Sequence, residues 1–238
     1  MQKNTDTILK MSTEKAYKCE YCGKGYMKES TLAVHMCEKK RRWLQKDEKR
    51  VRYGLYAFQR FYALSAGTKK EKTYEDFVGS PYYNAFVKFG SFISNVRPLY
   101  PERYIDYVVT SGVKLDHWAR DELYEKYALE LILKEDATTA LERSIQTMLD
   151  WADEKKSVYN HYFRYVSTNR AVQHIKDGKI SPWIVLNSDT GLEMLSTFND
   201  EQLAMIYNVI DPKHWSIKFQ RYKSDVEMVK QIVKEAGL

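Results

Sequence analysis

Three cysteines and one histidine near the start of this chain are spaced as the ligands of a metal ion would be. Two residues separate Cys19 from Cys22, twelve separate Cys22 from His35, and one separates His35 from Cys37. The chain of 238 residues has no cysteine outside this segment. Zinc prefers four tetrahedral ligands of thiolate sulfur and imidazole nitrogen, and two residues between cysteines let one tight turn present both sulfurs. We therefore expect one structural zinc ion, because four protein ligands leave no open position for water.

Residues 15–42 resemble a zinc finger of the two-cysteine, two-histidine class, in the variant whose last histidine is replaced by cysteine. Tyr17, Tyr26 and Leu32 stand where that class keeps the residues of its small core. Gly23-Lys24 resembles the turn that follows the second cysteine, where backbone N–H groups point at thiolate sulfur. The resemblance implies a small ββα-like unit with Cys19, Cys22, His35 and Cys37 as its ligands.

The last two ligands depart from the pattern of the class. The class usually leaves three to five residues between them, whereas here only Met36 separates His35 from Cys37. Residues two apart on an α-helix do not face each other. We therefore expect the helix to end or tighten just after His35, so that Cys37 can turn back.

Two other states of the cysteines are open. The three thiols could be free in a reducing compartment. Alternatively, two could form a disulfide and leave one spare, although the odd number and the lack of a signal peptide do not favour an oxidising compartment. Metal analysis of the purified protein separates these states from a zinc site.

The resemblance also names the finger residues that would face bases, which are Lys28, Thr31 and Val34. Lys28 and Thr31 can form hydrogen bonds there, whereas Val34 can only contact a thymine methyl group. One finger covers about three base pairs, too few for sequence specificity by itself. Single fingers also brace a neighbouring element or bind protein, so the finger alone leaves both roles open.

Positive charge is concentrated directly after the last cysteine. Residues 1–70 carry 17 Lys and Arg against 7 Asp and Glu, whereas residues 71–238 carry 21 against 25. A basic stripe of this kind is typical of phosphate binding, which depends strongly on salt because counterions are released. The residues predicted to bind nucleic acid are Lys28 and Thr31 of the finger, then Lys39, Lys40, Arg41, Arg42, Lys46, Lys49 and Arg50.

The same stretch has the spacing of an amphipathic helix, in which the charges are simply solvated on the outer face. Aromatic side chains interleave with the charges and can either stack on unpaired bases or pack in the core. We favour core packing for them and phosphate contact for the basic run. The aromatic residues are Trp43, Tyr53, Tyr56, Phe58, Phe61 and Tyr62.

Composition and length indicate a mainly α-helical, folded protein. Apolar residues make up 44% of the chain. A membrane-spanning helix needs about twenty consecutive apolar residues, and the sequence contains no such run. A chain of this length buries one large core, or a core plus a small module. We expect a disordered leader over 1–14, the finger over 15–42, a basic amphipathic linker helix over 43–66 and a helical domain over 67–238, in the cytoplasm.

Caps and apolar periodicity predict particular helices after residue 70. Thr73 and Asp76 have the spacing of a capping box, and Gly178 suits the left-handed position after a helix. The apolar run 180–186 is expected to be extended, and its Trp183 either fills the core, which we favour, or lines a ligand groove. Further helices are expected from Asp116, from Asp136 or Thr138, and over 158–175, 200–210 and 224–236.

The residues after the finger contain no recognisable catalytic motif. Phosphate-binding glycine loops, a nucleophile elbow and a His-Glu-x-x-His pair are all missing from the sequence, and the remaining histidines are scattered. A metal-dependent nuclease could use carboxylates, but any charged helix pair supplies as many. The carboxylates in question are Asp116, Asp121, Glu122, Glu125, Glu130 and Asp150.

These observations predict a non-enzymatic, zinc-dependent, weakly sequence-specific nucleic-acid-binding protein, with DNA favoured over RNA. The first alternative is a zinc-stabilised adaptor that binds another protein. The second is a nuclease that the finger targets. The helical character and the high tyrosine and lysine content after the finger are similar in style to accessory proteins of tailed bacteriophages, which would place the protein in a host cytoplasm; no motif outside the finger carries that likeness.

Overall fold

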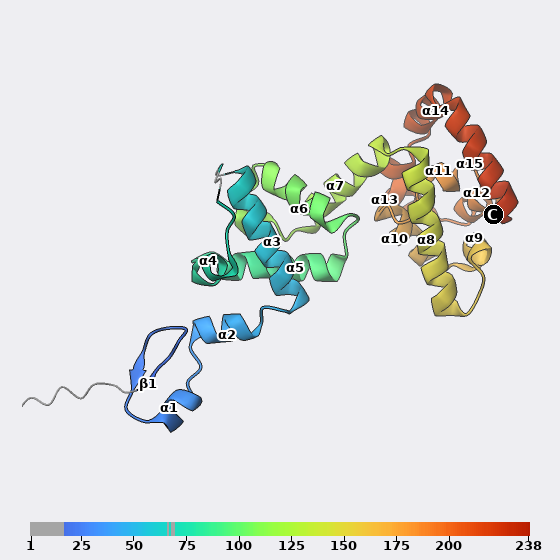
Figure 1. Cartoon of the computed structure of the whole chain (residues 1–238). Helices are drawn as coiled ribbons and strands as arrows, with labels where there is room; N and C mark the ends of the chain where they lie inside the picture. The colour runs from blue at the N-terminus through green and yellow to red at the C-terminus, as the bar shows by residue number, and fades with distance from the viewer. Residues whose placement is uncertain (1–16, 66, 68–69) are drawn as a thin grey trace, which may run out of the picture. The chain divides into compact units, whose positions relative to one another are not determined.

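The computed structural model describes residues 17–65, 67 and 70–238. These residues are mainly helical, with one two-stranded sheet near the start of the chain (Figure 1). They form two compact units that divide between Ser91 and Phe92. The leader expected over 1–14 lies outside the described residues. None of the described helices is both long enough and apolar enough to cross a bilayer.

The first unit begins with two short antiparallel strands, β1 (Tyr17–Lys18) and β2 (Gly25–Tyr26), in which Tyr17 pairs with Tyr26. Gly23 turns the chain between them with a φ of +71°, a conformation that glycine adopts without strain. The short helix α1 (Glu29–Ala33) follows. Two strands and a helix thus stand where the ββα-like unit was expected.

The single helix expected over 43–66 is instead two helices, α2 (Glu38–Leu44) and α3 (Lys49–Leu64). The chain turns at Gln45–Glu48, and Glu48 restarts the helix from an extended conformation. Neither glycine nor proline occurs in this turn. The helical spacing of apolar residues therefore continues across it, and the sequence gives no local signal that the helix breaks there.

Helix α3 packs against α5 (Tyr83–Val96) through two glycines. A Cβ atom at Gly90 would lie 1.9 Å from the carbonyl oxygen of Arg50, and one at Gly54 would lie 2.9 Å from that of Phe86. Phe58 is 2% exposed and contacts Phe86 edge-on, which confirms core packing for that aromatic. The division of the units after Ser91 puts helix α4 (Tyr74–Gly79) and most of α5 with α3, whereas a division at 66/67 was expected.

Helix α4 (Tyr74–Gly79) begins with the capping box expected from Thr73 and Asp76. The Thr73 hydroxyl accepts from the Asp76 N–H, and the Asp76 carboxylate accepts from the Thr73 N–H. This prediction is confirmed, because a capping box depends only on residues three apart.

The second unit is a set of helices around a core that contains Trp118, Trp183 and Trp215, each 1% exposed. Figure 1 shows these helices from α6 to α15. Their bounds are α6 (Pro101–Thr110), η1 (Leu115–His117), α7 (Asp121–Lys134), α8 (Ala137–Lys155), η2 (Tyr159–His161), α9 (Tyr162–Tyr165), α10 (Thr168–Lys176), α11 (Pro182–Val185), α12 (Asp189–Ser196), α13 (Asp200–Ile210), α14 (Pro212–Arg221) and α15 (Lys223–Ala236).

Several expectations for this unit are confirmed. Asp136 caps α8 by accepting from the Thr139 N–H, α13 has the expected bounds, and α15 begins one residue earlier than expected. Gly178 follows α10 with a φ of +72°. Trp183 fills the core and does not line a groove.

Other expectations are wrong. The helix expected over 158–175 is broken, because Val166 is extended between α9 and α10. The run 180–186 contains a short helix, α11, which Ser181 caps and Pro182 starts at a favourable first position. Helix α7 begins at Asp121 and not at Asp116, and α6, α12 and α14 were not predicted. Periodicity alone does not distinguish a continuous apolar run such as 180–186 from a buried strand.

Candidate metal centre

The ligand atoms of Cys19, Cys22, His35 and Cys37 all lie within 4.8 Å of one another. The Sγ atoms of Cys19 and Cys37 are 4.0 Å apart, and Cys22 Sγ is 3.4 Å from His35 Nε2. In a tetrahedron with metal–sulfur bonds of about 2.3 Å and metal–nitrogen bonds of about 2.0 Å, the S–S edges are about 3.8 Å and the S–N edges about 3.5 Å. The four side chains therefore surround the volume of one metal ion.

The turn between the strands positions the first two cysteines. The Cys19 N–H donates to the Lys24 carbonyl at 2.9 Å, and the Gly23 N–H donates back to the Cys19 carbonyl at 2.8 Å. These bonds close the loop around Cys22, so both sulfurs project to one side of the turn. Cys19 is buried and Cys22 is exposed.

The last two ligands lie after α1 and not on it. The helix ends at Ala33, two residues before His35 and so earlier than expected. The His35 N–H donates to the Leu32 carbonyl at 3.0 Å, a tight turn that carries the chain away from the helix axis. This early end is how His35 and Cys37 approach one ion although only Met36 separates them.

Cys37 is also the N-cap of α2. Its backbone is extended, and its Sγ accepts a hydrogen bond from the Lys40 N–H at 3.3 Å. The same sulfur thus joins the cluster and satisfies a backbone donor at the start of the next helix, so one side chain links the cluster to the start of α2.

Tyr26 orients the imidazole of His35. Its hydroxyl lies 2.7 Å from His35 Nδ1, while Nε2 faces Cys22. When Nε2 holds a metal ion, Nδ1 carries the proton and donates to the Tyr26 hydroxyl oxygen. The tyrosine that the resemblance placed in the finger core therefore also lies in the outer shell of the site.

The cluster favours a cation electrostatically. Desolvation acts to raise the pKa of the Cys19 thiol, but hydrogen bonds from the backbone of Cys22 and Tyr21 outweigh it and leave the pKa below its usual value. A backbone hydrogen bond at Lys24 acts to lower the pKa of Cys22, yet desolvation and the neighbouring sulfurs of Cys19 and Cys37 raise it. Three thiolates so close together need a positive ion between them.

Aromatic contacts attach the finger to the helices of the first unit. The ring of Tyr21, next to Cys22, lies 6.4 Å from that of Trp43 on α2. Trp43 in turn meets Tyr74 of α4 edge-on at 5.0 Å, and the Tyr74 hydroxyl donates to the Arg42 carbonyl at 2.6 Å. The metal-binding turn thus packs on α2, and α2 packs on α4.

The predicted nucleic-acid-binding residues have different surroundings. Lys40 is half-buried, and its ammonium donates to the His35 carbonyl at 3.3 Å. Arg42 has 13% of its side chain exposed; its guanidinium donates to the Val78 carbonyl and to Glu38 and lies 4.2 Å from the centre of the Tyr83 ring. Arg50 pairs with Glu48 at 2.6 Å. The exposed members of the set are Lys28, Thr31, Lys39, Arg41, Lys46, Lys49 and Arg50.

The finger helix offers little surface to a base pair. Helix α1 has five residues, and Lys28 is its N-cap. Val34 lies beyond the end of α1 and is 81% exposed. Met27 and Met36 are also exposed, at 58% and 57%. Helix α1 contains no basic residue, whereas α2 and α3 contain four each, so α2 and α3 carry more positive charge than the finger helix.

The carboxylates considered for a nuclease are not gathered into a site. Throughout 17–65, 67 and 70–238, the only group of three or more metal-ligating side chains within reach of one ion is the Cys-His cluster.

No family model matches the chain, and comparison with curated proteins and with solved structures also gives no match. The function of the protein is therefore inferred from the chemistry of its own residues.

Proposed function

We propose that the cluster holds one zinc ion in a structural role. Three thiolates and one imidazole are a donor set that suits zinc, and four protein ligands leave no position for water or substrate. Three thiolates around a divalent ion leave one net negative charge, and Lys39, Lys40 and Arg41 follow directly on α2 to balance it. Zinc stoichiometry in the purified protein tests this assignment.

We further propose that the protein binds nucleic acid without catalysing a reaction on it. The observation that carries the proposal is that Cys37 joins the metal cluster and caps α2, the helix that displays Lys39 and Arg41 to solvent. A bound zinc ion would then fix the start of α2, so that the side chains of Lys39 and Arg41 keep a constant orientation relative to the finger. Lys46, Lys49 and Arg50, in the turn and at the start of α3, extend the positive surface.

Contacts of this kind read phosphates and not bases. Lysine and arginine side chains on a helix surface neutralise the backbone and release counterions, whatever the sequence. Because α1 is short, only Lys28 and Thr31 of the finger remain to touch base edges. We therefore propose weak sequence specificity, with duplex DNA as the first ligand to test.

Arg42 has a different role in this proposal. Its guanidinium is held by Val78, Glu38 and the Tyr83 ring. It positions α2 on α4 and α5 and does not contact phosphate.

Charge reversal at three exposed sites tests the proposal. In the variant Lys39→Glu, Arg41→Glu, Lys46→Glu, we expect DNA retention at low salt to be lost and the helical content to be unchanged. The matched control, Lys114→Glu, Lys213→Glu, Lys230→Glu, makes the same change in net charge at exposed sites of the second unit. Equal retention by both variants would show that the charge near the finger is not the binding surface.

A protein-binding adaptor is the second candidate, and the exposed apolar side chains of Met27, Val34 and Met36 favour it. Methionine side chains adapt well to partner surfaces. The two candidates differ in salt dependence, because phosphate binding weakens linearly in log–log salt for arbitrary sequences. An adaptor would instead show no binding to DNA by the wild type and would bind one protein saturably, with a loss of affinity in Val34→Asp.

A further inference from the structure

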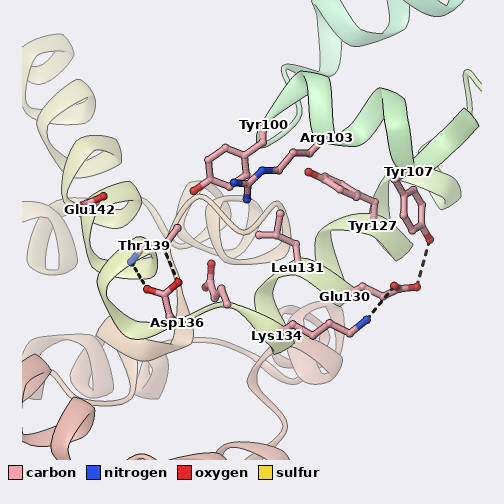
Figure 2. A pocket seen from close by; sticks show the side chains of 11 residues that line it. Tyr100, Arg103, Tyr107, Tyr127, Glu130, Leu131, Lys134, Asp136, Thr139 and Glu142 are labelled. Atoms are coloured by element: carbon pink, nitrogen blue, oxygen red, sulfur yellow. Dashed lines mark hydrogen bonds and ion pairs between the residues drawn. The ribbon is translucent and has the colours of Figure 1, made fainter. Parts of the chain in front are cut away.

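Two cavities in the described part of the second unit have linings that differ in charge. The larger, of about 590 Å³, lies among α6, α7 and the start of α8 and is shown in Figure 2. Its polar groups are largely occupied within the chain: Asp136 accepts from Thr139, and Glu130 pairs with Lys134 at 3.5 Å. These polar side chains therefore already have hydrogen-bond or ion-pair partners within the chain, and they do not indicate a ligand.

The smaller cavity, of about 440 Å³, is lined by residues at the end of α7 and along α14. Every charged residue in its lining is basic, although residues 92–238 as a whole carry 19 Lys and Arg against 22 Asp and Glu. His214, Lys218 and Arg221 recur at positions i, i+4 and i+7, so they share one face of α14. A basic lining inside an acidic unit is suited to an anion.

Lys218 lies at the base of this cavity. The residue is 8% exposed, and its ammonium donates to the carbonyls of Leu133 at 2.9 Å and Glu135 at 2.8 Å. These two bonds neutralise the negative end of α7. The ammonium also lies 4.9 Å from the centre of the Trp215 ring and 5.3 Å from that of Trp183, so Lys218 contributes positive charge to the cavity and not a free donor.

Two other groups in the lining lack partners within the described part of the chain. The Nε2 atom of His214 is shielded from solvent and has no hydrogen-bond partner there. Arg221 is exposed and forms no ion pair with a described residue. The His214 nitrogen is closed off from solvent in this structure, so the cationic group that a ligand in the cavity can reach directly is the exposed guanidinium of Arg221.

The apolar part of the lining limits what this group can be. Leu133, Ile217 and Tyr222 complete the wall, and Ile217 and Tyr222 are 53% and 44% exposed. Inorganic phosphate alone would leave these surfaces in water. A ligand with an anionic head and an apolar or aromatic body covers them and reaches the basic groups.

We propose that this cavity binds a small organic anion, in which a carboxylate or phosphate pairs with Arg221 near the positive charge of Lys218, and an apolar or aromatic body rests on Ile217 and Tyr222. The site lies in the second unit and does not depend on the metal centre or on nucleic-acid binding. It needs no covalent chemistry.

Titration of the full-length protein with phenyl phosphate and with benzoate tests the proposal and distinguishes the two head groups. NMR signals of the His214 ring and of the Trp215 indole, whose rings lie 5.6 Å apart, report on the site. We expect saturable shifts with at least one of the two anions and none with benzyl alcohol, which has the body without the charge. Inorganic phosphate should bind at least tenfold more weakly than phenyl phosphate.

Two variants and one control locate the binding. Arg221→Ser removes a cation from the lining and should weaken binding at least tenfold, and Ile217→Asp should abolish it by placing a carboxylate in the cavity. Lys213→Ser removes the same charge from an exposed position of α14 outside the lining and should bind as the wild type does. No saturable shift at about 10 mM ligand, or equal binding by Arg221→Ser and Lys213→Ser, would overturn the proposal.

Discussion

The hydroxyl of Tyr26 lies 2.7 Å from Nδ1 of His35 and leaves the opposite ring nitrogen facing the three sulfurs. Outer-shell partners of this kind orient a ligand and raise its affinity for metal. The strand pair and the metal cluster are therefore linked through one hydrogen bond.

Tyr26→Phe tests that link. We expect zinc affinity to fall about 10- to 100-fold, because the imidazole loses the group that holds its tautomer and orientation. Competition with a chromophoric chelator measures the change. Tyr17→Phe is the matched control, since Tyr17 pairs with Tyr26 across the strands but has no contact with His35 among the hydrogen bonds of the described residues. Equal affinities for the two variants would remove the proposed role of Tyr26.

Substitution of Cys37 separates its two roles. Cys37→Ser and Cys37→Ala should both lose stoichiometric zinc, because neither supplies a thiolate. Serine can still accept from the Lys40 N–H, whereas alanine cannot, and loss of an N-cap costs about 1 kcal/mol. Zinc analysis together with hydrogen exchange of the Lys40 amide measures both effects. Faster exchange in the serine variant than in the alanine variant would contradict the assigned cap.

Arg41 and Arg42 are adjacent but should respond in opposite ways. Arg42→Ala should lower the free energy of unfolding of the first unit by about 1.5–3 kcal/mol, the usual range for hydrogen bonds to a charged group. Arg41→Ala should change stability by less than about 0.5 kcal/mol but lower the salt slope of DNA binding by about 1. Chemical denaturation and binding at several salt concentrations provide the two measurements. A salt slope lowered by Arg42→Ala and unaffected by Arg41→Ala would reverse the assignment.

Gly90→Ala should destabilise the first unit by about 3 kcal/mol or more, because the new methyl group overlaps the Arg50 carbonyl and pushes α3 away from α5. Gly79→Ala, in which the new methyl group meets nothing within 4 Å, should change stability by less than about 0.5 kcal/mol. Thermal unfolding of both variants checks this comparison. A small effect at Gly90 would mean that the two helices do not cross so closely.

Acid should destabilise the second unit through His174. Burial, followed by the charges of Lys179 and Arg170, lowers the pKa of His174 to about 4, whereas an unfolded histidine titrates near 6.5. Between these values the unfolded state binds more protons, so stability falls as the pH decreases from about 6.5 towards 4 and is level above that window. The unfolding free energy of His174→Gln should depend less on pH than that of the wild type. Identical pH profiles would contradict this prediction.

The features that the sequence predicted well depend on near neighbours. The spacing of Cys19, Cys22, His35 and Cys37 indicated a four-ligand cluster, and the capping patterns at Thr73 and Asp136 located helix starts. The caps depend on residues three apart, and the four ligands lie within nineteen residues of one another, so each pattern can be read from one short segment. The mainly helical fold followed from the same local signals.

Features that depend on what covers a side chain were decided by the tertiary structure alone. Arg41 and Arg42 are chemically equal in the sequence, yet Val78 and Tyr83, far along the chain, hold one of them and leave the other in solvent. Within the run 180–186, Pro182–Val185 form a buried helix, whereas the apolar pattern predicts burial but not whether the segment is helix or strand. Local sequence therefore determined the Cys-His cluster and the caps, whereas burial, a property of distant contacts, decided which cations are exposed to solvent.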